Sequence, residues 1–273
     1  MYEPYYIPKL KNADLLSGNV CYSLTHSTKF VRPNDDGLDE LHIHGYIEIF
    51  FNVASDVSFF VNDKLLPVGN GDAVISHPNE VHKCVFNSAK NHEYFCLWID
   101  TNGNSSLSSH FPKNNLLSFD KDTKEEIFSL LFRLYKIDEG GNEVEKTRII
   151  LQIIESLKNN RPSGQAKTIL PNSFQAVLTY ISENFANLKT VQEVADKFFI
   201  SPTTLLRNFN KYLCISPRKY LEQVKLSNAV QLLNQGSSVT EASLNSGFSD
   251  VSHFIVLFKK KFGTSPFKYK NTK

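Results

Sequence analysis

A stretch that occurs twice near the C-terminus decides how that part of the chain folds. It reads FNKYLCISPRKY at residues 209–220 and FKKKFGTSPFKY at residues 258–269. The offset between the copies is constant at 49 positions, and both copies share the first Phe, the Ser-Pro pair and the final Lys-Tyr pair. A repeat of this kind indicates that one structural unit is present twice.

Helix start signals surround both copies. Thr190–Glu193 and Ser238–Glu241 have the spacing of a capping box, which begins the first helix of each unit. The second helices begin after Ser201 and Asp250, whose side chains can cap a helix N-terminus. Each unit is therefore predicted to be a helix-turn-helix, and a long helix over residues 217–234 joins the two units.

The second helix of each unit is expected to have two different faces. In the first unit Leu205 and Phe209 lie four positions apart and should pack inward. The opposite faces carry side chains that can reach base edges in a DNA major groove. The expected base-reading residues are Thr203, Leu206, Arg207, Asn210, Ser252, Ile255 and Val256. The lysines expected to contact phosphates are Lys211, Lys219, Lys259, Lys260, Lys261 and Lys268.

Charge is distributed unevenly along the chain. Residues 171–273 contain 13 Lys and Arg against 6 Asp and Glu, a net charge of +7, whereas residues 1–170 carry a net charge of −5. A basic module beside an acidic remainder favours binding to a polyanion such as double-stranded DNA. The sequence has neither an apolar run long enough for a membrane span nor a secretory signal pattern. Its four cysteines are scattered, so a cytoplasmic protein with reduced thiols and no membrane contact is expected.

Residues 20–100 contain short runs rich in Val, Ile, Phe and Tyr, which turn residues separate. This spacing predicts an antiparallel sandwich or barrel. Within it, His42, His44 and Glu48 form the pattern H-x-H-x3-E, expected on one strand face, and His82 follows in the sequence GDAVISHPNEVH. Three imidazoles and a carboxylate can hold a divalent transition metal, or they can hydrogen-bond a small polar ligand such as a sugar.

Residues 119–160 change to a helical period. The spacing of Ile127, Leu131 and Leu134 predicts an amphipathic helix, Gly140-Gly141 breaks it, and a second helix follows. Two helices joined by a short turn pack as an antiparallel hairpin, and their apolar surface favours self-association.

The N-terminal segments HIHGYIEIFFNV and FVNDKLLPVGNGDAVISHPNEVHK resemble the cupin-type sensor half of AraC-family regulators. The segments SPTTLLRNFNKYLCISPRKYL and GFSDVSHFIVLFKKKFGTSPFKYK resemble the two halves of the AraC/XylS DNA-binding domain. The resemblance implies a multidomain α and β protein. Its expected parts are a cupin-like ligand-sensing antiparallel β-barrel over residues 1–118, a dimerising helical hairpin over 119–160, a linker over 161–171 and an all-α double helix-turn-helix domain over 172–273.

In function, the resemblance implies a homodimeric transcription regulator that binds promoter DNA under the control of a small-molecule effector, for example a carbohydrate. An activator of this kind would also contact RNA polymerase. The expected effector pocket contains His42, His44, Tyr46, Glu48, His82 and Trp98, with Phe60 as a further aromatic residue. The resemblance implies no enzyme activity, no cofactor and no metal ion.

Val256 and Cys214 are among the residues that depart from the family pattern. Val256 stands where the second unit usually has an arginine, and Cys214 stands where the first unit commonly has a glycine. Because Val256 cannot donate a hydrogen bond to a base, hydrogen-bonded specificity is expected under the first unit. Two other interpretations remain open: a cupin metalloenzyme that uses the His/Glu cluster, and a DNA-binding dimer that needs no effector.

Overall fold

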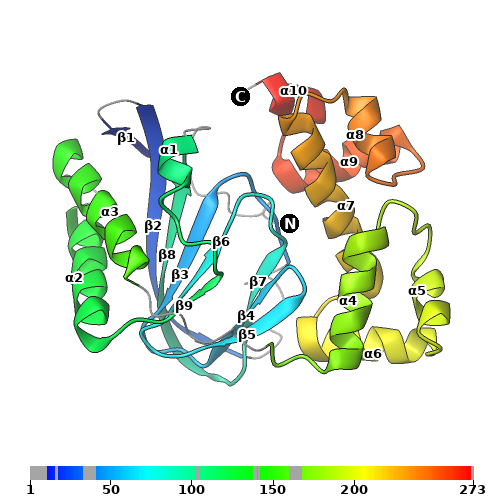
Figure 1. Cartoon of the computed structure of the whole chain (residues 1–273), viewed down its shortest axis with the longest axis horizontal. Coiled ribbons are helices and arrows are strands. Elements are labelled where there is room, and N and C mark those ends of the chain that lie inside the picture. The colour runs from blue at the N-terminus through cyan, green and yellow to red at the C-terminus, as the bar shows by residue number, and fades with distance from the viewer. Residues whose placement is uncertain are drawn as a thin grey trace.

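The protein structure, a computed structural model, describes residues 11–15, 18–32, 41–101, 105–137, 140, 142–159 and 168–271. Figure 1 shows a β-rich domain in the middle of the molecule, with a pair of helices on one side and a helical domain on the other. Most of the expected linker, residues 161–167, lies outside the described residues.

The strands of the β domain sort into two antiparallel sheets. The larger sheet has the order β1 (Lys11–Leu15), β2 (Gly18–Val31), β8 (Lys90–Asp100), β3 (Ile47–Asn52), β6 (Ala73–Ser76) and β9 (Leu116–Leu117). The smaller sheet has the order β5 (Lys64–Val68), β4 (Val57–Val61) and β7 (His82–Phe86). The short helix α1 (Ser105–Ser108) lies between β8 and β9 in the chain.

The two sheets do not close into the barrel that the sequence predicted. Strand β7 lies at the edge of the smaller sheet. Among the described residues, its pairing with a segment outside that sheet is an isolated bridge between His42 and His82. A barrel needs continuous hydrogen-bonded ladders between all neighbouring strands. The two-residue period of a strand shows which side chains face inward, but it does not show whether the edges of two sheets pair.

Alternation along β3 separates two apolar clusters. Ile47, Ile49 and Phe51 face the helices α2 (Lys121–Ile137) and α3 (Glu143–Lys158) and join their buried side chains. Phe50 points the other way and packs with the smaller sheet. Because successive side chains of a strand point to opposite faces, Glu48 also points between the sheets.

The helical hairpin of α2 and α3 follows the prediction from the sequence. Ile127, Leu131 and Leu134 are buried on α2, where they lie over the larger sheet. Asn142 caps α3 by accepting a hydrogen bond from the Val144 backbone N–H. The hairpin therefore covers the outer face of the larger sheet.

The C-terminal domain consists of helices in the order that the sequence predicted. These are α4 (Asn172–Asn184), α5 (Val191–Lys197), α6 (Pro202–Leu213), α7 (Pro217–Asn234), α8 (Val239–Asn245), α9 (Val251–Phe262) and α10 (Pro266–Asn271). Both capping boxes are present, and Ser201, Ser216 and Asp250 each accept a backbone N–H at the start of a helix. The two helix-turn-helix units are α5–α6 and α8–α9, and α7 joins them.

The turns of the two units differ by one residue. Phe199 and Gly247 occupy the same left-handed position, with φ of 52° and 78°, after the first helix of each unit. Ile200 N–H then donates to Ala195 O, just as Phe248 N–H donates to Ser243 O. Ser249 is the extra residue of the second turn, since the next helix is capped by Asp250 rather than by position 249.

The β domain and the helical domain share one apolar cluster. Leu41, Ile43, Phe60, Leu65 and Val81 pack with buried side chains of the helical domain. The chain that enters the helical domain is also attached to β5, because Ile169 N–H donates to Leu65 O and Leu65 N–H donates to Thr168 Oγ1. The two domains are therefore docked against each other.

Candidate nucleic-acid interface and histidine centre

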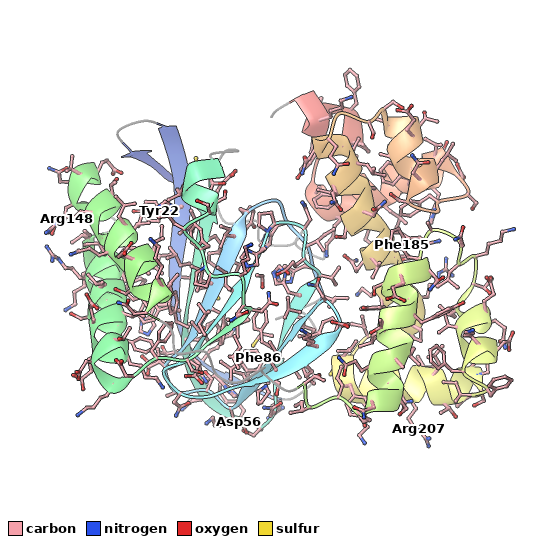
Figure 2. All side chains as sticks on the ribbon, viewed as in Figure 1. Tyr22, Asp56, Phe86, Arg148, Phe185 and Arg207 are labelled. Carbon is pink, nitrogen blue, oxygen red and sulfur yellow. The ribbon has the colours of Figure 1, made fainter. Side chains whose placement is uncertain are left out.

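Helix α6 has the two faces that the sequence predicted. Leu205 and Phe209 are buried in the core of the helical domain. The expected base-reading residues Thr203, Leu206, Arg207 and Asn210 are all exposed. Figure 2 shows Arg207 pointing away from the edge of the helical domain. The structure thus leaves this face of α6 accessible to a ligand.

Helix α9 repeats the geometry with different side chains. Phe254 and Phe258 take the buried positions, and the outward residues Ser252, Ile255 and Val256 are exposed. Val256 therefore occupies the position that Arg207 occupies on α6. An aliphatic side chain can contact a thymine methyl group, but it cannot hydrogen-bond to guanine.

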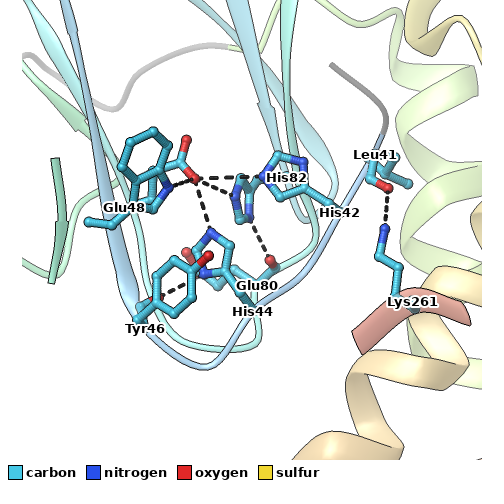
Figure 3. Close-up of polar contacts among 9 residues, drawn as sticks. Leu41, His42, His44, Tyr46, Glu48, Glu80, His82 and Lys261 are labelled. Atoms are coloured by element: carbon cyan, nitrogen blue, oxygen red, sulfur yellow. Dashed lines mark hydrogen bonds and ion pairs between the residues drawn. The ribbon is translucent and has the colours of Figure 1, made fainter. Parts of the chain in front are cut away.

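The expected phosphate-contacting lysines differ in their surroundings. Lys211, Lys259, Lys260 and Lys268 are exposed, and Lys219 is half-buried. Lys261 is also half-buried, and its Nζ donates to Leu41 O of the β domain at 3.1 Å (Figure 3). In this arrangement Lys261 connects the two domains.

A group of histidines lies around Glu48, between the two sheets (Figure 3). The pleat of β3 points the Glu48 side chain inward, and the antiparallel registers place Trp98 and Ser76 directly opposite it on β8 and β6. His82 begins β7 on the smaller sheet. The ligand atoms of His42, His44, Glu48 and His82 all lie within 4.8 Å of one another.

The local geometry differs in one respect from the sequence prediction. His42 and His44 do not share a strand with Glu48, because β3 begins at Ile47 and the chain bends at residues 45 and 46. His42 is instead held by the bridge to His82, with two backbone N–H···O distances of 3.0 Å. The pattern H-x-H-x3-E therefore brings the correct side chains together through a bend rather than along one strand.

Three contacts within this group of side chains converge on one oxygen atom, Glu48 Oε2. Glu48 Oε2 lies 3.0 Å from His44 Nε2, 3.3 Å from His82 Nε2 and 3.6 Å from His42 Nε2. Trp98 Nε1–H donates to the same oxygen at 2.8 Å. We call His42, His44, Glu48 and His82 the histidine centre.

Burial changes the ionisation of the centre. It lowers the pKa of His44 to about 4 and lowers the pKa of His42, because a buried imidazole loses the hydration of its charged form. Burial alone would raise the pKa of Glu48, but its contacts with three imidazoles hold that pKa well below the ordinary value.

The aromatic residues of the expected effector pocket have different positions. Tyr46 stacks on His44 with a ring separation of 3.8 Å, and Trp98 bonds to Glu48. Phe60 lies elsewhere, because it is buried at the domain interface against Tyr220. The expectation that Phe60 contributes to the pocket is therefore wrong: β4 points it toward the helical domain.

Several polar contacts that join the domains were not expected from the sequence. Lys83 Nζ donates to Leu213 O at the C-terminal end of α6, at 3.2 Å, and Tyr220 Oη–H donates to Asn62 O. Ser227 Oγ–H donates to Asn79 O. No local pattern marks these partners, because each pair is separated by more than a hundred residues.

Comparison with known proteins identifies the helical domain. A helix-turn-helix domain family matches residues 194–272, which include both helices α6 and α9. The chain carries an AraC-family helix-turn-helix domain. Its curated relatives are transcriptional regulators and not enzymes, in agreement with the expectation from the sequence.

The AraC-family domain is part of a wider similarity to these relatives. The transcriptional activator RhaS of Escherichia fergusonii is 27% identical over 164 residues, which cover 58% of each chain. RhaS of Escherichia coli O157:H7 is 30% identical over 138 residues, 47% of this chain and 48% of that protein. The chain thus spans about half the length of these relatives. The regulator YdeC of Bacillus subtilis is 21% identical over 268 residues, 92% of this chain and 90% of that protein.

The chain is also similar to solved structures. The C-terminal domain of AraT from Geobacillus stearothermophilus is 28% identical and covers 39% of this chain and 89% of that chain, with a TM-score of 0.37. ToxT from Vibrio cholerae O395 is 11% identical and covers 92% of this chain and 96% of that chain, with a TM-score of 0.38. Within the residues that the structure describes, no helix has the length and apolar character needed to cross a membrane.

Proposed function

We propose that the chain is a transcription regulator that binds specific sequences of double-stranded promoter DNA through α6 and α9. The observation that carries this proposal is the pair of equivalent helices whose outward faces are exposed inside a matched AraC-family domain. Two such helices joined by α7 can enter successive major grooves, which lie about 34–36 Å apart on one face of the duplex. The net charge of +7 on residues 171–273 favours the approach to DNA.

The two helices are proposed to read DNA differently. On α6, Arg207 can form a bidentate contact with guanine, and Thr203 and Asn210 can hydrogen-bond to neighbouring bases. On α9, Ile255 and Val256 suit thymine methyl groups. Exposed lysines such as Lys260 would contact phosphates, which position the protein without reading the sequence.

The β domain is proposed to control DNA binding in response to a small-molecule effector. Its support is the docked interface, where Lys83 holds the end of α6 and Lys261 of α9 bonds to Leu41. An effector can change DNA affinity if it binds the docked and undocked arrangements with different affinities. A carbohydrate at His42, His44, Tyr46, Glu48, His82 and Trp98 is the expectation from the sequence. An activator would in addition contact RNA polymerase.

The hairpin of α2 and α3 is proposed to form a homodimer. Phe132, Tyr135, Val144 and Leu151 are large apolar side chains that are exposed on the two helices. The hairpin lies on the side of the β domain opposite the helical domain (Figure 1). Pairing through these side chains would therefore leave α6 and α9 accessible, and exposed apolar surface can mark an association site.

Selection of bound duplexes from a randomised library tests the proposed function. The full-length chain should enrich an asymmetric site, with guanine specified in the half under α6 and A·T pairs favoured in the half under α9. The variant Arg207→Ala should lose the guanine preference in the same selection. Failure to enrich any sequence, or enrichment of two half-sites with equal guanine specificity, would contradict the proposal.

A further inference from the structure

The hydrogen bonds of two imidazoles fix where their lone pairs point. His44 Nδ1 lies 3.0 Å from Tyr46 O, and His82 Nδ1 lies 2.8 Å from Glu80 O. A carbonyl oxygen only accepts hydrogen bonds, so both Nδ1 atoms carry the proton. In a neutral imidazole the other ring nitrogen is then an acceptor. The Nε2 lone pairs of His44 and His82 therefore point into the histidine centre.

In this arrangement two hydrogen-bond acceptors, the Nε2 atoms of His44 and His82, face a third acceptor, Glu48 Oε2. The two Nε2 atoms lie 3.0 and 3.3 Å from Glu48 Oε2, which also accepts the Trp98 Nε1–H bond. A carboxyl group carries at most one proton, so Glu48 cannot donate to both lone pairs. His44 and His82 are 8% and 0% exposed and their rings lie 4.6 Å apart, so both lone pairs are buried beside this oxygen and away from water. One cation shared by all the ligand atoms satisfies them together.

The spacing of the atoms suits a transition metal. A tetrahedral ion with bonds of about 2.1 Å separates its ligand atoms by about 3.4 Å. The three separations between histidine Nε2 atoms and Glu48 Oε2 are 3.0, 3.3 and 3.6 Å. Imidazole nitrogens with one carboxylate select first-row transition metals over Mg²⁺ and Ca²⁺, which prefer oxygen ligands alone.

The surroundings of the centre also match those of a metal site. Histidine ligands in proteins usually donate their second N–H to a carbonyl or carboxylate, which orients the ring. Tyr46 O and Glu80 O accept these bonds from His44 and His82. Trp98 Nε1–H bonds to Glu48 Oε2 and would orient the carboxylate in the same way.

We propose that the histidine centre binds a divalent first-row transition metal ion and that this ion is the effector of the regulator. The claim that this ion is the effector rests on the proposed function. The resemblance implies no metal ion, and the hydrogen bonds to Tyr46 O and Glu80 O are the observations that favour one.

The centre is directly connected to both DNA-reading helices. His42 follows Leu41, whose carbonyl accepts the bond from Lys261 of α9. His82 precedes Lys83, which bonds to the last residue of α6. Drawing His42 and His82 toward one ion would move these two neighbours, which the His42–His82 bridge already holds together. Metal binding would thereby change how both helix-turn-helix units dock.

Metal titration of the full-length chain tests the site itself. Chelator-treated protein should bind one equivalent of Co²⁺, with a visible absorption band from nitrogen and oxygen ligands, and Zn²⁺ should displace it. Glu48→Gln, which keeps the side-chain volume, and His42→Gln should each weaken Co²⁺ binding by about 100-fold or more. His26→Gln is the matched control, because His26 pairs with Glu93 at 2.9 Å elsewhere in the same domain and its loss should leave Co²⁺ affinity unchanged.

The outcome separates the metal proposal from the proposed function. The metal site is overturned if the folded protein binds no Co²⁺ or Zn²⁺. It is also overturned if the Glu48→Gln and His42→Gln variants bind Co²⁺ as tightly as the unchanged protein. Both outcomes hold even if the protein selects a duplex. With the duplex that the protein selects, Zn²⁺ should change DNA affinity at least tenfold relative to chelator, and this change should disappear in Glu48→Gln. Equal affinity in both conditions overturns the effector role. Failure to select any duplex overturns the proposed function, and the Co²⁺ titration still decides the metal site.

Discussion

Lys261 donates from α9 to Leu41 O across the domain interface, over 220 residues of sequence. Its neighbour Lys260 is exposed to solvent. The two lysines therefore have different surroundings although they are adjacent in a basic run. Under the proposed function Lys260 would contact a phosphate, whereas Lys261 holds the domains together.

This difference predicts separate effects on the salt dependence of DNA binding. Lys260→Met should reduce the slope of log affinity against log salt by about 1, because one phosphate contact is lost. Lys261→Met should leave the slope unchanged, since its ammonium group is bonded to Leu41 O. Fluorescence anisotropy over a range of salt concentrations measures both slopes. An equal decrease for Lys261→Met would show that Lys261 leaves Leu41 to bind a phosphate.

Arg207→Ala should relax sequence specificity. Loss of one bidentate guanine contact costs about 1–3 kcal/mol against the preferred duplex and little against a duplex with that base pair changed. Val256→Ala on α9 is the matched control and should not alter guanine preference. Competition gel shifts at fixed salt compare the variants. A uniform loss of affinity for all sequences in Arg207→Ala would place Arg207 on a phosphate instead.

Phe199→Gly should stabilise the helical domain. Phe199 has a φ of 52° and is 97% exposed, so it has a strained backbone and little packing to lose. Glycine relieves the left-handed backbone strain, but it also has greater freedom in the unfolded chain. The net increase in the free energy of unfolding should be about 0.5–1 kcal/mol. The control is Gly263→Ala, where φ is 70° and a Cβ would meet nothing within 4 Å, so it should destabilise by about 1 kcal/mol. Urea unfolding measures both, and a loss of stability in Phe199→Gly would contradict the strain argument.

Lys225→Met should destabilise the helical domain by about 1–3 kcal/mol. Lys225 Nζ donates to Leu188 O at 2.7 Å and to Gly247 O at 2.8 Å, which connects α7 to the segment before α5 and to the turn of the second unit. Methionine fills a similar volume but leaves both carbonyl oxygens without this donor. Urea unfolding measures the decrease in the free energy of unfolding. Lys260→Met is the surface control, and its free energy of unfolding should be almost unchanged. An equal stability of both variants would show that water replaces the buried ammonium group.

Leu151→Glu should convert the proposed dimer to a monomer. Leu151 is exposed on α3, and a carboxylate in an apolar contact between subunits would lose its hydration. Light scattering after size-exclusion chromatography measures the molar mass. Phe267→Glu on α10 is the control, since it changes an exposed apolar residue outside the hairpin and should leave the mass unchanged. A dimer that persists in Leu151→Glu would place the dimer contact elsewhere.

Local features could be predicted from the sequence because their signals lie within a few residues. The capping boxes, the buried Leu205 and Phe209, and the exposed outward faces of α6 and α9 are of this kind. The open arrangement of the two sheets could not be predicted, because edge pairing joins distant segments. The same reason explains why Phe60 was assigned to the wrong surface, and why the partners of Lys83 and Lys261 were not expected.

The attachment of Thr168 and Ile169 to Leu65 has a consequence for competition with DNA. Only residues 160–167 separate the end of α3 and its cap from this attachment, a span of at most about 30 Å. A helical domain that undocks therefore stays at an effective concentration on the order of millimolar relative to the β domain. If the proposed duplex binds only the undocked arrangement, it competes with this tethered partner, and a weakening of docking by about 1.4 kcal/mol shifts that competition tenfold without any change in a residue that touches DNA.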